Sequence, residues 1–461
     1  MYLTASFANH QQRRISAYRN NSDPYCFFNL LTSNALLDTV ESLLPAHRKR
    51  LYPPIETLSM FLAQAMSSDR SCQNSVNQAA FQRLTGGLSD CSTYTGGYCR
   101  ARKRLPLEMI STLTCYLGQQ IDQSVPKQWR WQGRSVRIVD GTTVTMPDTP
   151  ANQAQFPQQR SQKPGLGFPI CRLVGITCLS SGVLLNAAIG RFNGKGSDEQ
   201  TLLRRIEDTF QAGDIVLGDA FFATYCFIAT MQAKGVDILM EQQGARQRST
   251  DFRLGYKLGQ KDHLIVIDKP KARPSWMSET QYHAMPDSLT VREFKAGGKI
   301  MVTTMTCPKN YTKEALKSLY KSRWHVELDI RHIKDTMGMN ILSCKTPDMA
   351  IKEIWVTLLA YNLIRLMMAQ SALLAEITPR SISFKHCLQW WLIWMQQPVI
   401  LDEARLYRLL LLMAQQQVGN RPDRIEPRAV KRRPKPFPLL TQQRTLAREK
   451  VRQYGHPKKL K

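Results

Sequence analysis

The sequence has few acidic residues for its length and no long uninterrupted apolar segment. Only 36 aspartates and glutamates stand against 63 lysines and arginines in 461 residues, which gives a formal net charge of +27. The most apolar stretch, residues 354–374, is interrupted by Asn362 and Arg365, and LQWWLIWM at 388–395 is too short to cross a bilayer. The first residues, MYLTASFANHQQRR, lack the continuous apolar core of a secretory signal. We therefore expect a cytoplasmic protein without a membrane segment, and the positive excess predicts a polyanionic partner, most often nucleic acid.

Closely spaced cysteine pairs are also lacking. The 11 cysteines are scattered without a CxxC motif, and the pairs Cys91/Cys99 and Cys171/Cys178 are too far apart in sequence for an ordinary zinc knuckle. An odd number of dispersed cysteines is typical of reduced, mostly buried thiols. We expect neither disulfides nor a structural zinc site.

The N-terminal region, residues 1–125, shows the apolar spacing of helices. LDTVESLLPAHRKRLY, PIETLSMFLAQAM and CQNSVNQAAFQRLTGG repeat apolar residues every three or four positions, and the two glycines that end the third stretch are a helix stop. A basic cluster, Arg100, Arg102, Lys103 and Arg104, precedes a further predicted helix. The cluster fits a DNA-contacting module and a solvated basic face equally well. We interpret the whole region as a helical DNA-binding domain.

From residue 134 the pattern changes to β-branched runs separated by glycine and serine. Three consecutive strands are predicted at SVRIVDGTTVTMP, CRLVGITCLSSG and VLLNAAIGRFNG. A helix at DEQTLLRRIEDTF, a strand at DIVLGDAFFA, a helix at TYCFIATMQAKG and a strand at VDILMEQQ follow. The order β-β-β-α-β-α-β predicts an α/β fold with a mixed sheet, and its first part spans residues 126–242.

The rest of the chain predicts four further segments. Residues 243–308 are basic and polar with short β-like runs, which predicts a strand-rich insertion before the core resumes over 309–345. Three apolar helices are predicted within 346–418. The tail, 419–461, carries 14 lysines and arginines against 3 acidic residues, with prolines among them. We expect it to be extended or only conditionally ordered and to lie along a phosphate backbone, the alternative being a solubilising tail.

Two aspartates stand out by their position in the predicted strands. Asp140 follows the apolar run VRIV, and Asp219 follows IVLG. A carboxylate among apolar neighbours is costly to desolvate unless something pairs with it. A divalent metal is one such partner. For either residue alone, a buried aspartate that is hydrogen-bonded to backbone is the favoured interpretation.

A third carboxylate lies in the segment YKSRWHVELDIRHIK, residues 320–334. On a regular helix with 100° per residue, one stripe about 80° wide collects Tyr320, Arg323, Glu327, Arg331 and Lys334. A separate apolar face collects Val326, Ile330, Ile333 and Met337. Ion pairs at i,i+4 explain the charges on the stripe but not its excess of cations or its aromatic residues. A metal ligand flanked by phosphate-binding cations explains both.

The spacing of Tyr320, Arg323, Glu327 and Lys334 resembles the Y-R-E-K signature of the IS-four family of bacterial insertion-sequence transposases. Asp140 and Asp219 look like the first and second catalytic aspartates of that family, and Glu327 would complete its DDE triad. The resemblance runs from about residue 130 to 345. Arg331 stands where some relatives carry a lysine, so the charge is kept.

The resemblance implies a ribonuclease-H-like core with a β-rich insertion. It implies that Asp140, Asp219 and Glu327 hold two Mg²⁺ ions, which Mn²⁺ would replace, for in-line displacement at phosphorus. Water would free a 3′-OH at the transposon end, a hairpin would form and be reopened, and the 3′-OH would join target DNA.

The resemblance also implies what the protein binds. Its double-stranded DNA partners would be the terminal inverted repeats of the element and the target, held by a homodimer in a synaptic complex at the bacterial nucleoid. Tyr320, Arg323 and Lys334 would grip phosphates, with Arg331 as a further DNA-binding cation. Trp324 would receive a base that leaves the stack, or else belong to the core.

Two rival functions stay open at the level of sequence. A metal-dependent nuclease with the same core would cleave DNA without strand transfer, since both steps share one site. A DNA-binding repressor with a decayed catalytic core is the non-enzymatic alternative, and the intact set of carboxylates argues against it.

Overall fold

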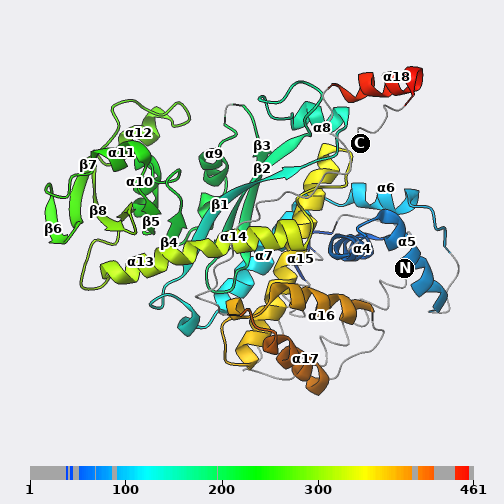
Figure 1. Ribbon diagram of the computed structural model, residues 1–461. Coiled ribbons are helices and arrows are strands. Elements are labelled where there is room, and N and C mark those ends of the chain that lie inside the picture. Colours follow the sequence, from blue (N-terminus) through cyan, green and yellow to red (C-terminus); the bar gives the residue numbers. More distant parts are fainter. Residues whose placement is uncertain are drawn as a thin grey trace, which may run out of the picture.

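A nine-stranded mixed sheet runs through the part of the chain that the structure, a computed structural model, describes (Figure 1). The described residues are 38–39, 42–44, 51–67, 69–85, 91–194, 196–396, 403–419 and 442–455. The strand order is β3-β2-β1-β4-β5-β9-β8-β7-β6. The bounds are β1 Val136–Thr145, β2 Ile170–Cys178, β3 Leu184–Arg191, β4 Ile215–Gly218, β5 Asp237–Glu241, β6 Tyr256–Gly259, β7 Asp262–Asp268, β8 Ser288–Ala296 and β9 Lys299–Thr303.

The first five strands follow the order predicted from sequence. β1, β2 and β3 are antiparallel neighbours, and β4 and β5 then add to the other edge of β1 in parallel. The helices α9, Glu199–Arg204, and α10, Tyr225–Ala233, provide the crossovers before β4 and β5. α9 is shorter than the helix predicted there, because the chain turns at Arg205 and continues as a 3₁₀ segment, Glu207–Thr209.

The strands predicted as an insertion are present, and they continue the same sheet. β9 pairs with β5 in antiparallel fashion, and β8, β7 and β6 follow outward. Two short helices, α11 Gly244–Ser249 and α12 Glu279–Ala284, lie between these strands. The division of the chain into domains stays a prediction.

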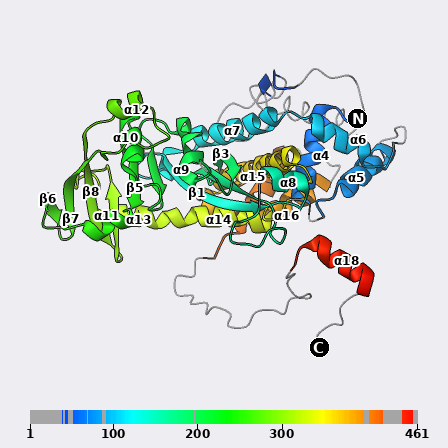
Figure 2. The same ribbon diagram turned by 90° about the horizontal axis from the view of Figure 1, so that it is seen from above.

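Helices cover both faces of the sheet, and Figure 2 shows α7 on one side and α13 with α14 on the other. Alternation in β1 directs Ile138 toward a core shared with Leu319 and Val326 of the α13–α14 side. Val139, the next residue, belongs to the larger core on the opposite face. The helices named here are α7 Leu107–Ser124, α13 Lys313–Lys321 and α14 His325–Arg331.

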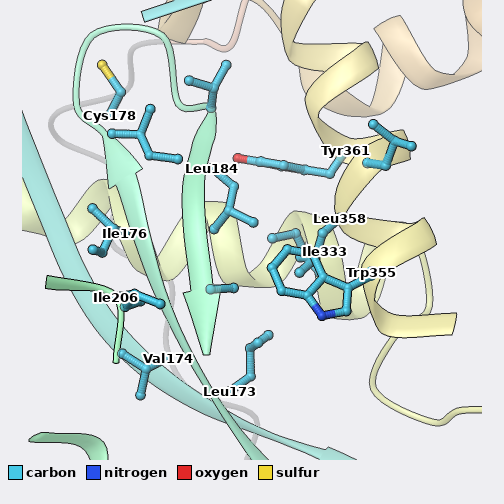
Figure 3. Close-up of a cluster of buried hydrophobic side chains, with 14 of the residues drawn as sticks. Leu173, Val174, Ile176, Cys178, Leu184, Ile206, Ile333, Trp355, Leu358 and Tyr361 are labelled. Carbon is cyan, nitrogen blue, oxygen red and sulfur yellow. The ribbon is translucent and has the colours of Figure 1, made fainter. Parts of the chain in front are cut away.

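The larger core is organised around the 28-residue helix α15, Pro347–Leu374. Figure 3 shows its residues Trp355, Leu358 and Tyr361 facing the side chains of β2 and β3. α15 is long and apolar enough to cross a membrane by composition, but 89% of its most apolar window is buried inside the protein. Its two polar interruptions are satisfied, since Asn362 accepts from the Leu184 N–H and Arg365 pairs with a buried aspartate. α15 is therefore a core helix.

Of the remaining helices, α4 Pro54–Met66 and α5 Cys72–Thr85 in the N-terminal region and α16 Phe384–Gln396 and α17 Glu403–Gln415 after α15 fit the sequence pattern. In contrast, α8 Pro150–Gln155, which follows β1, was not predicted, and the basic cluster predicted to precede a helix lies within α6 Gly96–Arg104. Within the tail, which was predicted to be extended or only conditionally ordered, the structure describes a helix, α18 Arg444–Tyr454. Most of the first predicted helix, 37–52, and the rest of the tail lie outside the described residues.

The segment from α13 to residue 336 is not the regular helix that the 100° wheel assumed. A 3₁₀ turn, Ser322–Trp324, separates α13 from α14, and a π-helical segment, His332–Thr336, follows α14. The 3₁₀ turn is wound more tightly than an α-helix and the π segment more loosely. The wheel is therefore wrong in detail on both sides of Glu327.

Candidate active site

Asp140 lies where β1 extends beyond its parallel neighbour. β4 pairs with β1 only over Val136–Ile138, whereas β1 continues to Thr145. The Asp140 carboxylate accepts from the Gly141 N–H at 2.8 Å. Burial raises the pKa of Asp140, with Asp219 and Glu327 adding to the rise while Arg323 and the Gly141 hydrogen bond oppose it. Arg323 is the cation that favours the ionised form of this carboxylate in the structure.

The parallel register brings Asp219 beside Asp140. Ile138 is paired with Leu217, and Asp140 and Asp219 each follow two residues later in their own chains. Asp219 begins the loop after β4, where its Oδ1 accepts from the Phe221 N–H at 2.9 Å. The two aspartates thus reach one edge of the sheet from adjacent strands, as side chains at the carboxyl ends of parallel strands do.

Glu327 joins them from α14 on the overlying face. The Arg323 guanidinium lies 3.3 Å from Asp140 Oδ2 and 3.4 Å from Glu327 Oε1, so a single arginine contacts carboxylates from β1 and α14. All three side chains are partly buried, with exposed fractions of 20%, 19% and 36% for Arg323, Asp140 and Glu327. The predicted carboxylates are therefore gathered in one partly buried region.

The other residues predicted from the segment 320–334 divide into two groups. Tyr320 faces β4, where its hydroxyl donates to the Gly218 carbonyl at 3.5 Å, and burial raises its pKa. Lys334 faces β1, where its Nζ donates to Thr142 Oγ1 at 3.2 Å. Arg331 and Trp324 point to solvent, and the Trp324 side chain is 56% exposed. The core alternative for Trp324 is therefore wrong.

The donor set suits a hard divalent cation. Carboxylate oxygens are the ligands that Mg²⁺ and Mn²⁺ prefer, and the like charges that raise the pKa of Asp140 are the kind that a cation offsets. Among the residues that the structure describes, no three acidic, histidine or cysteine side chains are already gathered at ligand distances. The Arg323 guanidinium instead lies between two of the carboxylates.

A further carboxylate that sequence reasoning missed lies beside this group. Glu199, the first residue of α9, packs against Gly141, the residue after Asp140. Burial raises the pKa of Glu199, with Arg172 opposing the rise and Asp140 and Asp219 adding to it. In the sequence, Glu199 is an ordinary acidic residue in the first turn of a helix. Only the fold distinguishes it, because it brings Glu199 next to Gly141.

A buried ion cluster below the site was also missed. Asp329 is fully buried on α14 and pairs with Arg365 of α15 at 2.5 Å and with Arg380 at 2.9 Å. Arg380 also donates to the Cys178 and Leu179 carbonyls at the end of β2. The helix that carries Glu327 is thus tied to α15 and to the sheet.

The basic cluster of α6 turns out to be mixed. Arg102 is buried, donates to Cys72 Sγ at 3.0 Å and lies over the rings of Phe61 and Tyr98. Arg100, Lys103 and Arg104 are exposed. One of the four cations is therefore a core residue, and three are on the surface.

The chain has recognisable relatives. Residues 131–363 match the family model described as a transposase DDE domain. The chain is 29% identical over 360 residues to the transposase InsG for insertion sequence element IS4 of Escherichia coli (strain K12), which covers 74% of this chain and 77% of that protein. Among solved structures, it is similar to the cryo-EM structure of a piggyBac transposase synaptic complex with hairpin DNA, with a TM-score of 0.42, 10% identity and 85% of each chain covered.

Proposed function

This chain belongs to the family of DDE transposases, and on that premise we propose that it cleaves DNA at the ends of an insertion sequence and joins the freed 3′ ends to target DNA. The kinship with IS-four family transposases expected from the Y-R-E-K spacing is confirmed by the match to the IS4 element transposase. The strand arrangement, three antiparallel strands followed by two parallel ones with helices between, supports the ribonuclease-H-like core.

The observation that carries the proposal is the contact of Arg323 with both Asp140 and Glu327. Asp219 joins them because Asp140 and Asp219 each follow two residues after the paired residues Ile138 and Leu217. We propose that the three carboxylates hold two Mg²⁺ ions. When bound, the ions would activate the attacking oxygen and stabilise the leaving 3′ oxygen. Asp140, Asp219 and Glu327 would be the residues that hold the ions, and the charges of Asp219 and Glu327 both act on Asp140.

The reaction proceeds in four displacement steps in this proposal. Water attacks phosphorus at the transposon end, and the 3′ oxygen leaves and takes a proton. The 3′-OH then attacks a phosphorus of the opposite strand and displaces the 3′ oxygen of that strand, which takes a proton, and a hairpin results. A second water attacks the hairpin phosphorus and displaces the 3′ oxygen again, which restores the 3′-OH. Finally this 3′-OH attacks a phosphorus of target DNA, forms the new phosphodiester and displaces a 3′ oxygen of the target strand, which takes a proton. No covalent bond to protein is needed, so Tyr320 is not a nucleophile.

The cations and aromatics around the carboxylates would hold the DNA. Tyr320, Arg323 and Lys334 border the site and can bind phosphates near the cleaved bond. Arg331, on the exposed side of α14, extends the positive surface. Trp324 offers an exposed indole on which a displaced base can stack. We also propose that a homodimer binds the two ends of the element in the bacterial nucleoid, because both ends must be held together to be joined to the target.

The test uses the full chain with labelled duplexes that carry the inverted repeats flanking its reading frame. With Mg²⁺, we expect 3′ nicks, hairpins and joined products, whereas nicks alone would favour the rival nuclease. Asp140→Asn, Asp219→Asn and Glu327→Gln should each abolish cleavage while end binding is retained. Asp335→Asn, an exposed aspartate of the same segment, is the matched control and should retain cleavage. Normal cleavage by Glu327→Gln would falsify the triad.

A further inference from the structure

We propose that Glu199 is a fourth carboxylate of the active site and helps Asp140 and Asp219 to hold the divalent cations. The inference rests on the proposed function, because it adds a ligand to the metal site assigned there. Glu199 does not belong to the Y-R-E-K segment and is not one of the two aspartates at the strand ends. Three features of the fold support it.

The first feature is the attachment of α9 to the loop that carries Asp219. Asp198 caps the helix, with Oδ1 accepting from the Thr201 N–H at 2.9 Å. The side chain of Gln200 donates to the carbonyl of Phe221, two residues beyond Asp219. The first turn of α9, where Glu199 lies, is therefore fixed next to the end of β4.

The second feature is the absence of a side chain at Gly141. A Cβ there would lie 2.4 Å from Glu199 Cδ and 2.5 Å from Glu199 Oε1, which is far inside van der Waals contact. Gly141 lies in the extended strand β1 and is not among the glycines with positive φ, so its backbone does not require glycine. The reason for glycine at this position is the room it leaves for the carboxyl group of Glu199.

The third feature is the open edge of β1 at this level. Asp140 and Gly141 point to opposite faces of the sheet, as neighbouring residues of a strand do. β4 pairs with β1 only as far as Ile138, so beyond that residue the neighbour of Asp140 at this edge is the loop that begins with Asp219 and not a paired strand. A carboxyl group that lies over Gly141 can approach the two aspartates around this edge.

The charge around Glu199 also calls for a cation. Its side chain is partly buried, and within the described residues no lysine, arginine or histidine lies within ion-pair distance of it. The guanidinium of Arg172, the cation that lowers the pKa of Glu199, lies over the Phe192 ring, 5.0 Å from its centroid. A partly desolvated carboxylate next to two others is costly unless a cation is shared among them. The proposed divalent ions supply that cation.

The experiment measures Mn²⁺ binding to the full chain by calorimetry, without DNA, so that the readout is independent of cleavage. Glu199→Gln should weaken Mn²⁺ binding by about tenfold or more, a loss of the size that metal-site residues cause, and Glu199→Asp should weaken it less. The matched control is Glu207→Gln, because Glu207 is a partly buried glutamate just beyond α9. It should bind Mn²⁺ as the parent does.

The outcomes separate this inference from the proposed function. If Asp140→Asn weakens Mn²⁺ binding and both Glu199 variants leave it unchanged, the fourth carboxylate is refuted and the triad stands. If Asp140→Asn also leaves it unchanged, the metal site itself is refuted. Circular dichroism checks folding of each variant. Should Glu199→Gln unfold, Glu199→Asp, which keeps the charge and withdraws the carboxyl by one methylene, decides in its place.

Discussion

Replacing Asp329 by asparagine tests whether the buried ion cluster fixes the helix of Glu327. Asp329 is 0% exposed, and its two oxygens accept from Arg365 Nη2 and from both Nη atoms of Arg380. Asparagine keeps the shape but removes the charge. Two guanidinium groups would then face a neutral amide, and the one on Arg365 is only 2% exposed.

The expected cost is about 3 kcal/mol of unfolding free energy. Removing one member of a buried ion pair costs roughly 3–5 kcal/mol, because the partner charge stays buried. The lower end applies here, since Arg380 keeps its hydrogen bonds to the Cys178 and Leu179 carbonyls. Arg365 likewise keeps the Tyr361 hydroxyl at 2.8 Å.

The cost should also depend on pH in a defined direction. Burial alone would raise the pKa of Asp329, yet Arg380 and Arg365 hold it below its ordinary value. Because its pKa is lowered in the folded state, ionised Asp329 stabilises that state above the unfolded-state pKa of about 3.9. This contribution is lost as the pH falls from there through the folded-state pKa. The difference between parent and variant should therefore be full at pH 7 and shrink below about pH 4.

Urea unfolding followed by circular dichroism measures the effect. The same substitution at Asp208, whose ion pair with Lys234 has a fully exposed carboxylate, is the control and should leave the midpoint unchanged. A loss below about 1 kcal/mol at pH 7, the size of a surface pair, would refute the claim that the cluster anchors α14. So would an equal loss at pH 3 and pH 7.

Three further outcomes are expected. Gly118→Ala should lower the melting temperature by several degrees, because its Cβ would lie 2.1 Å from a β3 carbonyl oxygen, whereas Gly244→Ala, with nothing within 4 Å, should not. Burial, with Arg380, lowers the pKa of His325 to about 4, and burial, with Arg365, lowers that of His332 to about 3. The unfolded chain then binds more protons below pH 6.5, so stability should fall from there toward pH 4, and replacing both histidines by glutamine should flatten this part of the stability curve. Lys334→Ala should weaken end binding and make its salt dependence shallower, by a slope change near one in a filter-binding titration, if Lys334 contacts a phosphate.

The order of the core elements was accessible from sequence because period and composition change together there. The runs around Asp140 and Asp219 are β-branched and apolar, which is the sequence pattern of strands that are buried on both faces. Once β1 and β4 are paired in parallel, the two aspartates lie at the same end of neighbouring strands. The apolar face of the segment 320–334 was also predicted, and Val326 and Ile333 are buried as expected.

What sequence reasoning missed depends on contacts between distant segments. Arg102 belongs to a run of cations, and only the rings and thiols packed around it make it a core residue. Glu199 is distinguished by Gly141, which lies 58 positions earlier in the chain. In the sequence, Asp329 is one of several charged residues on a helix, and only the fold shows that it pairs with Arg365 of α15. Each is a partly or fully buried charge whose partner cannot be found by periodicity.

The segment around α14 faces β1, and the two have different spacings along their axes. Asp140 and Thr142 are two residues apart on β1, a rise of about 7 Å, whereas Glu327 and Lys334 are seven apart and a straight α-helix would separate them by about 10 Å. Lys334 lies in the π segment, which takes more residues per turn than an α-helix, and its long side chain reaches Thr142. Arg323 and Lys334, two residues of the signature, thus both contact β1, at Asp140 and at Thr142, through a segment whose geometry the regular wheel described wrongly.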